Sequence, residues 1–263
     1  MPEGPEIRRA ADQLAAALGS EPLINAAIYR PGLEHTAKDL IGRRVSSITT
    51  RGKAMLTRFD HGLTLYSHNQ LYGVWKVAKS GERPQTTRSL RVVLETDKKA
   101  LLLYSASDIA LLDADGLSRH AFLQRLGPDV LDEETTAGDV LLRLQDPRYS
   151  GRQLGALLLD QGFLAGLGNY LRSEVLFHAG LLPMHRPRDL DAAERTHLAS
   201  VCLDVPRRSY RSRGRRGKTY SENGAFRFAV FDREGEPCLS CGNEIQRQEV
   251  ASRRLYWCPV CQA

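Results

Sequence analysis

Residues 238–261 read CLSCGNEIQRQEVASRRLYWCPVC, and two cysteine pairs organise this part of the chain. Cys238 and Cys241 form the first pair, Cys258 and Cys261 form the second, and sixteen residues separate them. Two such pairs, joined by a β-hairpin, can supply four thiolates to a tetrahedral zinc ion. Because protein ligands fill all four positions, none remains for water, and the expected ion is structural. The stretch therefore predicts a zinc ribbon.

The predicted hairpin carries two arginines, Arg253 and Arg254, near its tip. A rigid tip that presents guanidinium groups suits phosphate, because guanidinium forms bidentate hydrogen bonds with phosphate oxygens. A turn that is merely solvated explains the same residues equally well. The hairpin by itself leaves both interpretations open.

The composition of the 263-residue chain indicates a globular protein with room for two domains. Its 37 Lys and Arg against 31 Asp and Glu, with a pI near 9.2, favour a polyanionic partner. No run of 18 apolar residues and no basic, then apolar leader is present, so neither a membrane span nor a signal peptide is expected. We expect a cytoplasmic protein, where paired cysteines favour metal over disulfides. Cys202, in an apolar helical stretch, is expected to be a buried thiol.

Short alternating segments follow an N-terminal helix and predict an antiparallel sandwich or barrel. The expected strands are 23–29, 43–50, 53–59, 63–68, 71–79, 90–95 and 100–105. From about Leu117 helical periodicity takes over, and the expected helices are 139–144, 153–160, 170–178 and 192–201. Leu126-Gly127-Pro128 breaks the chain, so we expect a domain boundary near residue 125. A cleft between unlike domains is a common ligand site.

The N-terminus reads MPEGPEIRR, and a helix explains most of it. Pro5 suits the first turn and Glu6 suits the positive end of the helix dipole. Pro2 and Glu3 precede this helix. If Met1 is removed, Pro2 presents an α-amine, and such amines have a pKa of roughly 8 against about 10.4 for lysine, so more of the amine is neutral at pH 7. It can then attack an aldehyde-like carbon, as in Schiff-base catalysis, while Glu3 moves the proton; a plain helix start is the alternative.

Residues 161–170, QGFLAGLGNY, connect two apolar helices through three glycines. Gly168 and Asn169 fall where the second helix begins, so free backbone N–H groups and an amide side chain are expected to point outward as an anion site. The stretch is not a dinucleotide fingerprint, because its third glycine is missing and no strand precedes it. A tight helical hairpin capped by Asn169 explains the residues equally well.

Two turns of the predicted sandwich carry further candidate residues. The stretch TTRGK at 49–53 joins two strands and places Lys53 at a turn. The stretch SHNQLYG at 67–73 makes a second turn with an amide, an aliphatic and an aromatic group in Gln70, Leu71 and Tyr72. An enzyme that extrudes a base from duplex DNA needs such groups to fill the vacated stack. For Leu71 and Tyr72, a core strand is the interpretation that the sequence alone favours.

Basic residues crowd one segment without a single acid: Arg207, Arg208, Arg211, Arg213, Arg215, Arg216 and Lys218. We interpret the segment as a mobile basic loop that is drawn to a phosphate backbone, with plain solubility as the alternative. GRRGKT at 214–219 is not a nucleotide-binding loop, because Ser212 stands where glycine is required and no hydrophobic strand precedes it. Nucleotide hydrolysis is therefore excluded.

Taken together and in order, these features resemble the formamidopyrimidine-DNA glycosylase and endonuclease VIII family of base-excision repair enzymes. MPEGPEI, YSHNQLYGVW and DQGFLAGLGNYLR look like its bacterial endonuclease VIII branch, and the resemblance runs from Met1 to Cys261. It implies an α+β fold with three domains. These are an N-terminal antiparallel β-sandwich with flanking helices in 1–124, a helical helix–two-turn–helix DNA-binding domain in 125–228, and a zinc-ribbon β-hairpin in 229–263.

The resemblance also implies roles for single residues. Pro2 would attack the sugar carbon that bears the damaged base, and Glu3 would donate the proton for base release. Lys53 is the position associated with β-elimination, and Arg253 is the one associated with δ-elimination. The positions that match DNA contacts are Gln70, Leu71, Tyr72, Arg125 and Asn169, of which the first three would fill the gap left by the flipped nucleotide.

The implied function is that of a bifunctional DNA glycosylase and apurinic/apyrimidinic (AP) lyase that acts on oxidised pyrimidines in double-stranded DNA. An iminium at the sugar carbon acidifies the neighbouring proton, so the nucleophile that removes the base also permits strand cleavage. This chemistry needs no redox or nucleotide cofactor, and we expect one structural zinc ion and a monomer. Two alternatives stay open: the sister activity on oxidised purines, and a zinc-ribbon DNA-binding protein without catalysis.

Overall fold

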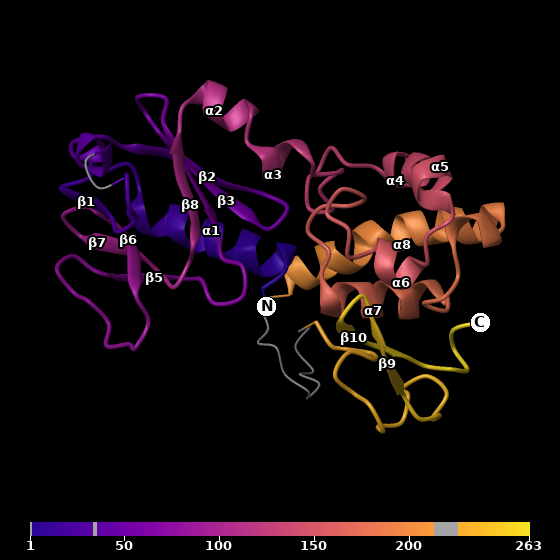
Figure 1. Cartoon of the computed structure of the whole chain (residues 1–263). Helices are drawn as coiled ribbons and strands as arrows, with labels where there is room; N and C mark the ends of the chain where they lie inside the picture. Colours follow the sequence, from indigo (N-terminus) through magenta and orange to yellow (C-terminus); the bar gives the residue numbers. More distant parts are fainter. Residues whose placement is uncertain (1, 34–35, 213–225) are drawn as a thin grey trace. The chain divides into compact units, whose positions relative to one another are not determined.

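The computed structural model describes residues 2–33, 36–212 and 226–263 (Figure 1). These residues form two compact units. The first contains Pro2 and Glu6–Gln124, and the second contains Glu3–Pro5 and Arg125–Ala263. The division into three domains, with boundaries after residues 124 and 228, stays a prediction.

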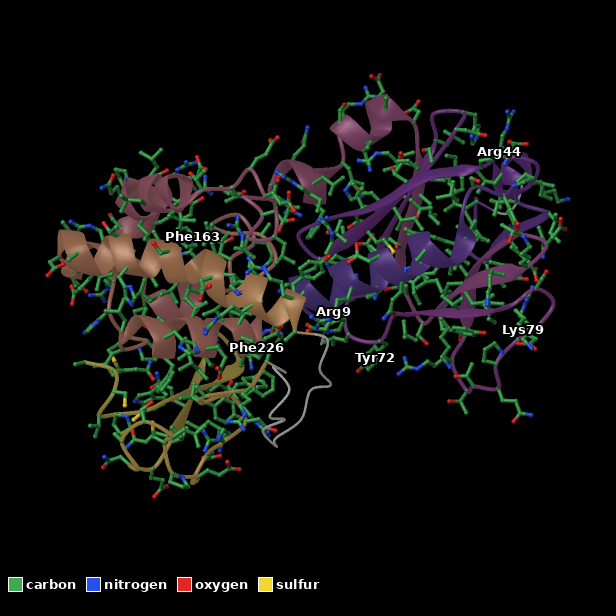
Figure 2. All side chains as sticks on the ribbon, turned by 180° about the vertical axis from the view of Figure 1, so that it is seen from behind. Arg9, Arg44, Tyr72, Lys79, Phe163 and Phe226 are labelled. Carbon is green, nitrogen blue, oxygen red and sulfur yellow. The ribbon has the colours of Figure 1, made fainter. Side chains whose placement is uncertain are left out.

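The first unit contains two four-stranded antiparallel sheets, which confirms the expected sandwich. One sheet has the order β1-β6-β7-β5, with bounds Asn25–Ile28, Leu90–Glu95, Lys99–Tyr104 and Val74–Lys79. The other has the order β2-β3-β4-β8, with bounds Val45–Arg51, Ala54–Phe59, Thr64–His68 and Asp108–Leu112. Charged side chains such as Arg44 and Lys79 lie at the surface of this unit (Figure 2). The sequence does not predict β8, which pairs with β4 in the register His68 to Asp108.

Helix α1 (Gly4–Leu18) supplies one face of the sandwich core. Its buried residues recur at helical spacing and pack against residues of both sheets: Ile7, Ala11, Leu14 and Leu18. The short helices η1 (Thr36–Leu40), α2 (Ala114–Ser118) and α3 (Ala121–Gln124) complete the unit. Phe122 of α3 packs with Tyr66 of β4 in a separate small cluster. Apolar periodicity is therefore sufficient to explain why α1 forms and which face it buries.

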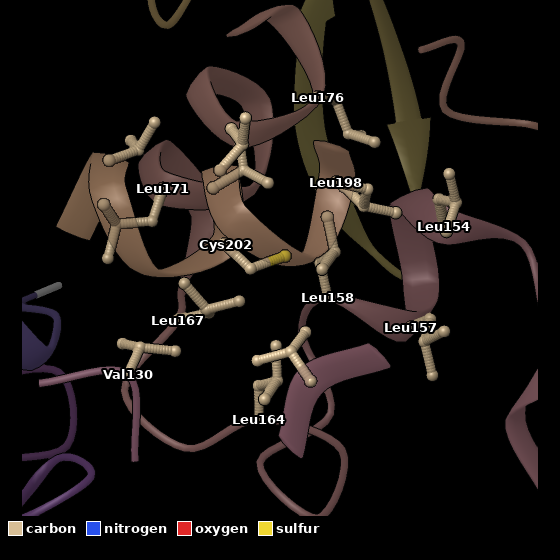
Figure 3. Close-up of a cluster of buried hydrophobic side chains, with 14 of the residues drawn as sticks. Val130, Leu154, Leu157, Leu158, Leu164, Leu167, Leu171, Leu176, Leu198 and Cys202 are labelled. Atoms are coloured by element: carbon tan, nitrogen blue, oxygen red, sulfur yellow. The ribbon is translucent and has the colours of Figure 1, made fainter. Parts of the chain in front are cut away.

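The second unit is helical, as expected, and ends in a β-hairpin. Its elements are α4 (Ala137–Gln145), α5 (Pro147–Ser150), α6 (Leu154–Leu157), α7 (Asn169–Ala179), η2 (Pro187–Asp189), α8 (Ala192–Arg211), β9 (Gln246–Val250) and β10 (Arg253–Trp257). Cys202 lies among buried leucines that include Leu158, Leu167 and Leu198 (Figure 3). Burial raises the pKa of Cys202 to about 12, so this thiol is part of the core. No helix in the described part of the chain is both long and apolar enough to cross a membrane.

Helix α8 extends further than the sequence predicts. Arg207, Arg208 and Arg211 belong to this helix, so the expectation of a loop at these three positions is wrong. Pro206 lies inside the helix without ending it, and the Arg207 guanidinium donates to the carbonyl oxygens of Asp132 (2.9 Å) and Thr135 (2.7 Å). These packing contacts outweigh the local signal of the proline. The remaining basic positions lie outside the described residues: Arg213, Arg215, Arg216 and Lys218.

Candidate functional site

The Glu3 carboxylate caps the N-terminus of α7. Glu3 is 2% exposed, and its two oxygens accept the backbone N–H groups of Tyr170 (2.8 Å) and Leu171 (3.2 Å). The backbone N–H of Gly4 donates to the carbonyl of Gly166 at 2.9 Å, which fixes the chain on either side of the carboxylate. The first N–H groups of a helix lack partners within the helix and favour negative charge. The carboxylate of Glu3 is therefore the anion at the N-terminus of α7.

Gly168 makes room for that carboxylate. A Cβ atom at this position would lie 2.3 Å from Cδ of Glu3, a distance that real side chains do not tolerate. The expected outward-pointing anion site is wrong for Tyr170 and Leu171, because Glu3 already accepts their N–H groups. The alternative of a cap by Asn169 is wrong too, since Asn169 is the first helical residue and Gly168 precedes it without a side-chain cap.

Asn169 instead faces the tip of the β9–β10 hairpin. Its Nδ2 donates to the carbonyl of Arg254 at 2.8 Å, and its Oδ1 accepts from the guanidinium of Arg172 at 2.9 Å. The same guanidinium donates to the carbonyls of Gly155 (2.7 Å) and Arg253 (3.0 Å). Arg172 thus ties the start of α7 to the hairpin tip.

The predicted hairpin is present, and its tip is a tight two-residue turn. Arg253 pairs with Val250, and the intervening Ala251 and Ser252 have φ of 53° and 58°. Positive φ at both central residues is the mark of a type I′ turn, whose twist matches that of the strands. The side chains of Arg253 and Arg254 are exposed beside this turn, so the backbone of the tip is held while its guanidinium groups face solvent.

Arg172 is a residue that sequence reasoning missed. It is fully buried, and burial first, then the charge of Arg253, lowers its pKa to about 10, while the charge of Glu3 opposes the shift. The sequence did contain a signal for the role of Arg172: this charged residue follows Asn169 by three residues, on a helix that has no polar face. Since α7 is buried from Tyr170 to Leu176, a charged residue within it needs partners.

Glu174 of α7 was missed for the same reason. It accepts the backbone N–H groups of Ala229 (2.8 Å), Val230 (3.0 Å) and Phe231 (2.9 Å). Burial raises the pKa of Glu174, and these three donors oppose that shift. The contacts fix the chain just before the zinc ribbon against α7.

The four ribbon cysteines meet as the sequence predicts. All four Sγ atoms lie within 4.8 Å of one another, with 3.8 Å between Cys238 and Cys261 and 3.4 Å between Cys241 and Cys258. A tetrahedral ion with Zn–S bonds of about 2.3 Å sets its sulfurs roughly 3.8 Å apart. The thiols therefore fit a zinc ion with four protein ligands.

Lys53 lies in the first unit at a tight turn between β2 and β3. Arg51 pairs with Ala54, which leaves Gly52 and Lys53 as the turn residues, and Gly52 has a φ of 59°. The lysine is only 7% exposed. Because buried lysines are rare outside functional or paired settings, its burial marks it as more than a solvated turn residue.

Residues 69–73 form a loop between β4 and β5, which we call the 69–73 loop. Leu71 is 58% exposed and Tyr72 is 69% exposed, and Figure 2 shows Tyr72 at the surface. The core-strand interpretation of these two residues is therefore wrong, since β5 starts only at Val74. The loop closes through the N–H of Gly73, which donates to the carbonyl of Asn69 at 2.7 Å. A Cβ at Gly73 would lie 2.6 Å from Cα of Asn69, so this turn requires glycine.

The remaining predicted residues are placed as follows. Pro2 is half-buried and lies two residues before the first residue of α1, and Met1 lies outside the described residues. Arg125 is exposed and begins the main part of the second unit. The second unit thus brings Glu3, Asn169 and the backbone of Arg253 around α7, whereas Lys53 and the 69–73 loop belong to the first unit.

Three family models match successive parts of the chain. The formamidopyrimidine-DNA glycosylase N-terminal domain matches residues 1–108, and the formamidopyrimidine-DNA glycosylase H2TH domain matches 126–219. The zinc finger found in FPG and IleRS matches 235–263. The order of the three models follows the order of the sandwich, the helices and the ribbon.

Full-length relatives are similar along the whole chain. Endonuclease 8 of Escherichia coli O17:K52:H18 is 55% identical over 262 residues, and Endonuclease 8 of Escherichia coli K12 is 54% identical, each with 100% of both chains covered. Among solved structures, a complex of Lactococcus lactis Fpg with DNA containing an abasic site has a TM-score of 0.84 at 24% identity, with 99% of each chain covered. A complex of the same protein with DNA containing N7-benzyl-Fapy-dG has the same TM-score at 23% identity and the same coverage. These structures confirm the fold.

Proposed function

The chain belongs to the formamidopyrimidine-DNA glycosylase family, and on this premise we propose that it removes oxidised pyrimidines from duplex DNA and cuts the strand by β,δ-elimination. As a member of this family it is a base-excision repair DNA glycosylase with AP lyase activity, and its ribbon holds a structural zinc ion. The proposal concerns the substrate and the residues that act on it.

The observation that carries the proposal is the fixed carboxylate of Glu3 next to Pro2. Two backbone N–H groups at the start of α7 hold this carboxylate and stabilise its charged form. In that form Glu3 accepts a proton from the Pro2 ammonium, which frees the amine as a nucleophile. Pro2 then attacks the sugar carbon, the bond to the base breaks, and Glu3 returns the proton to the leaving base.

The proton left on the Pro2 nitrogen then passes to the ring oxygen of the sugar, the bond between that oxygen and the attacked carbon breaks, and an open-chain iminium forms. Elimination follows from this iminium. Loss of the neighbouring sugar proton expels the 3′ phosphate in the β-step, and a second elimination expels the 5′ phosphate. We assign the first step to Lys53 and the second to Arg253. The exposure of the Arg253 guanidinium at a backbone-fixed tip supports its contact with phosphate.

DNA is the partner, and we propose that Gln70, Leu71, Tyr72, Arg125 and Asn169 contact it. The exposure of Leu71 and Tyr72 supports insertion of the 69–73 loop into the gap left by a flipped nucleotide. For Asn169 the support is weaker, because both ends of its amide already bond within the protein. The monomeric state and the cytoplasmic location remain predictions from the sequence.

Borohydride trapping tests the proposal. The protein without Met1 is incubated with duplex DNA that carries an oxidised pyrimidine, and reduction should give a covalent adduct. Retention of Met1 turns the Pro2 nitrogen into a peptide bond and should abolish the adduct, and peptide mapping should place the wild-type adduct on Pro2. Tight DNA binding without any adduct would contradict the assignment of Pro2.

The sister activity on oxidised purines is the second candidate. The matching family models describe formamidopyrimidine-DNA glycosylase domains, and this match supports activity on oxidised purines. A parallel reaction with 8-oxoguanine duplex decides between the two. Faster trapping on the purine duplex than on the pyrimidine duplex would reverse the substrate assignment.

A further inference from the structure

The side chain of His68, at the end of β4, forms a hydrogen bond with the backbone of Gln70. His68 is the last residue of β4, and its Nδ1 accepts the N–H of Gln70 at 3.0 Å. Gln70 has a φ of 47°, a left-handed conformation that a residue other than glycine adopts at a cost. An acceptor at this point compensates part of that cost. The contact therefore bears directly on the shape of the 69–73 loop.

The side chain of Gln70 is fixed as well. The Ser107 hydroxyl donates to Oε1 of Gln70 at 2.9 Å. At the other end of the loop, the N–H of Gly73 donates to the carbonyl of Asn69. Gln70 is thus held at its backbone and at its amide, while Leu71 and Tyr72 project into solvent. This arrangement presents the exposed pair on a defined turn.

The surroundings of His68 favour the neutral form of its ring. Burial is the main cause that lowers its pKa, the charge of Lys53 lowers it further, and the charge of Asp108 on β8 opposes the shift. The ring also meets Phe122 of α3 edge-on, with 5.1 Å between centroids. A neutral imidazole carries its proton on one nitrogen only. Because Nδ1 is the acceptor for Gln70, the proton lies on Nε2.

We propose that His68 is a positioning residue: its neutral ring holds Gln70 in the left-handed conformation and so sets the shape in which the 69–73 loop enters DNA. The entry of the loop into DNA rests on the proposed function, whereas the contact within the protein does not. Protonation places a hydrogen on Nδ1 and removes the acceptor. Acid pH should therefore release the loop through His68.

Two substitutions separate the two ring nitrogens. In His68→Asn the amide oxygen takes the position of Nδ1 and still accepts from Gln70. In His68→Gln the amide sits where Nε2 was and leaves the Gln70 N–H without its acceptor. His61→Asn is the matched control, because neither ring nitrogen of His61 makes a hydrogen bond in the described part of the chain.

The first measurement uses the free protein. Nitrogen NMR of the wild type should show the Nε2–H tautomer of His68, and the Gln70 amide signal should shift with the ring as the pH falls below 6.5. Exchange of the Gln70 amide with solvent should be roughly 2- to 10-fold faster in His68→Gln than in wild type, as expected for one lost hydrogen bond. It should be unchanged in His68→Asn and in His61→Asn. An Nδ1–H tautomer, or unchanged exchange in His68→Gln, overturns the proposal.

The second measurement uses duplex DNA with 2-aminopurine opposite an oxidised pyrimidine, at pH 7.5 and at a pH below the midpoint of the His68 titration found by NMR. In wild type, the rise in fluorescence on binding should be smaller at the lower pH, and His68→Asn should remove this dependence. A wild-type rise equal at both pH values contradicts the proposal. Borohydride trapping runs in parallel. If adducts form but the behaviour of the loop does not depend on His68, this inference is wrong and the proposed function stands. If no adduct forms but the NMR results are as predicted, the proposed function is wrong and the role of His68 within the protein stands.

Discussion

The Glu3 carboxylate accepts the backbone N–H of Tyr170 at 2.8 Å, although 167 residues separate the two in the chain. Glu3, the second residue of the predicted catalytic pair, therefore also caps the buried helix α7. The position of Glu3 therefore depends on α7 as much as on its own neighbours. Substitutions in α7 or just before it should therefore change the rate of the reaction, although they leave Pro2 and Glu3 themselves unaltered.

Gly168→Ala should impair base removal. The added Cβ would occupy the space of Cδ of Glu3 and displace the carboxylate. General acid–base catalysis contributes on the order of 10²- to 10⁴-fold, so we expect base release to slow by at least about tenfold. Cleavage of a preformed abasic site needs no base release and should be affected less. Single-turnover rates on the two substrates measure the difference.

Gly138→Ala is the matched control for that substitution. Gly138 lies in α4, and its added Cβ would meet only Thr136 Oγ1 at an ordinary 3.5 Å. Both rates should match those of the wild type. If Gly168→Ala slows neither step relative to this control, the carboxylate position is not limiting.

Arg253→Ala should stop the reaction largely at the β-elimination product. The guanidinium of Arg253 is exposed at the tip, and its loss removes a phosphate ligand while the turn stays fixed by Arg172. Electrophoresis resolves the β- and δ-products. Arg247→Ala is the control, because Arg247 lies at the other end of the hairpin and bonds Glu234 at 2.6 Å. Unchanged δ-product in Arg253→Ala would remove this residue from the proposed step.

Arg172→Leu should destabilise the second unit and loosen the hairpin tip. The substitution leaves the buried carbonyl of Gly155 and the half-buried acceptors of Arg253 and Asn169 without this donor. Unsatisfied buried polar groups cost about 1–3 kcal/mol each, so the free energy of unfolding should fall by roughly 2–4 kcal/mol. Urea unfolding measures this loss. The δ-product should also fall, and Arg172→Lys should restore it only partly, because an ammonium lacks the planar fork.

Zinc removal should unfold the ribbon and abolish the δ-step. The four thiols are the ligands that hold β9 and β10 to the chain around them, and structural zinc sites of this kind supply folding free energy. Titration of the thiols with a mercurial should release one zinc ion per chain, read with a metal-sensitive dye. Cys202 is buried outside this group, so Cys202→Ala should leave the zinc content unchanged. A zinc content of zero in fully active protein would contradict the structural role.

Glu95 should make the first unit sensitive to acid. The side-chain hydrogen bond from Arg83, at 2.8 Å, is the largest cause that lowers the pKa of Glu95 to about 2, and Gly81 and Asn25 add further donors. Because the folded pKa is depressed, the stabilisation is present above the ordinary value of 4.5 and is lost as the pH falls towards 2. At pH 7, Glu95→Gln should lower the free energy of unfolding by about 1–3 kcal/mol.

The pH series provides the check on Glu95. The difference between wild type and Glu95→Gln should shrink as the pH falls from 5 to 2, in chemical unfolding followed by circular dichroism. Glu21→Gln is the control, because its partner Lys98 lies at the surface, where ion pairs contribute little. A difference that is constant with pH would mean that the charge of Glu95 is not what stabilises the unit.

Local chemistry made much of this protein predictable from sequence. The cysteine spacing fixes the zinc ligands, since four thiolates at that separation suit a tetrahedral ion. The apolar spacing after Pro5 fixes α1, and the alternating segments fix most strands of the sandwich. Lys53 and Arg253 were placed at their turns because turn residues are recognised from a few neighbours. These features depend on residues that are close in the chain.

Only the tertiary structure decided which distant groups meet. Glu3 fills the helix terminus that the sequence left open between an outside anion and a cap by Asn169, Arg172 binds the hairpin tip, and His68 holds Gln70. Local pattern alone favoured a core strand for Leu71 and Tyr72, whereas the family resemblance implied contact with DNA; the loop closed by Gly73 leaves both side chains exposed. Periodicity reports whether a residue is buried, but not which donor or acceptor it meets. The partners of a buried charge come from segments brought together by packing, and burial then makes those contacts obligatory.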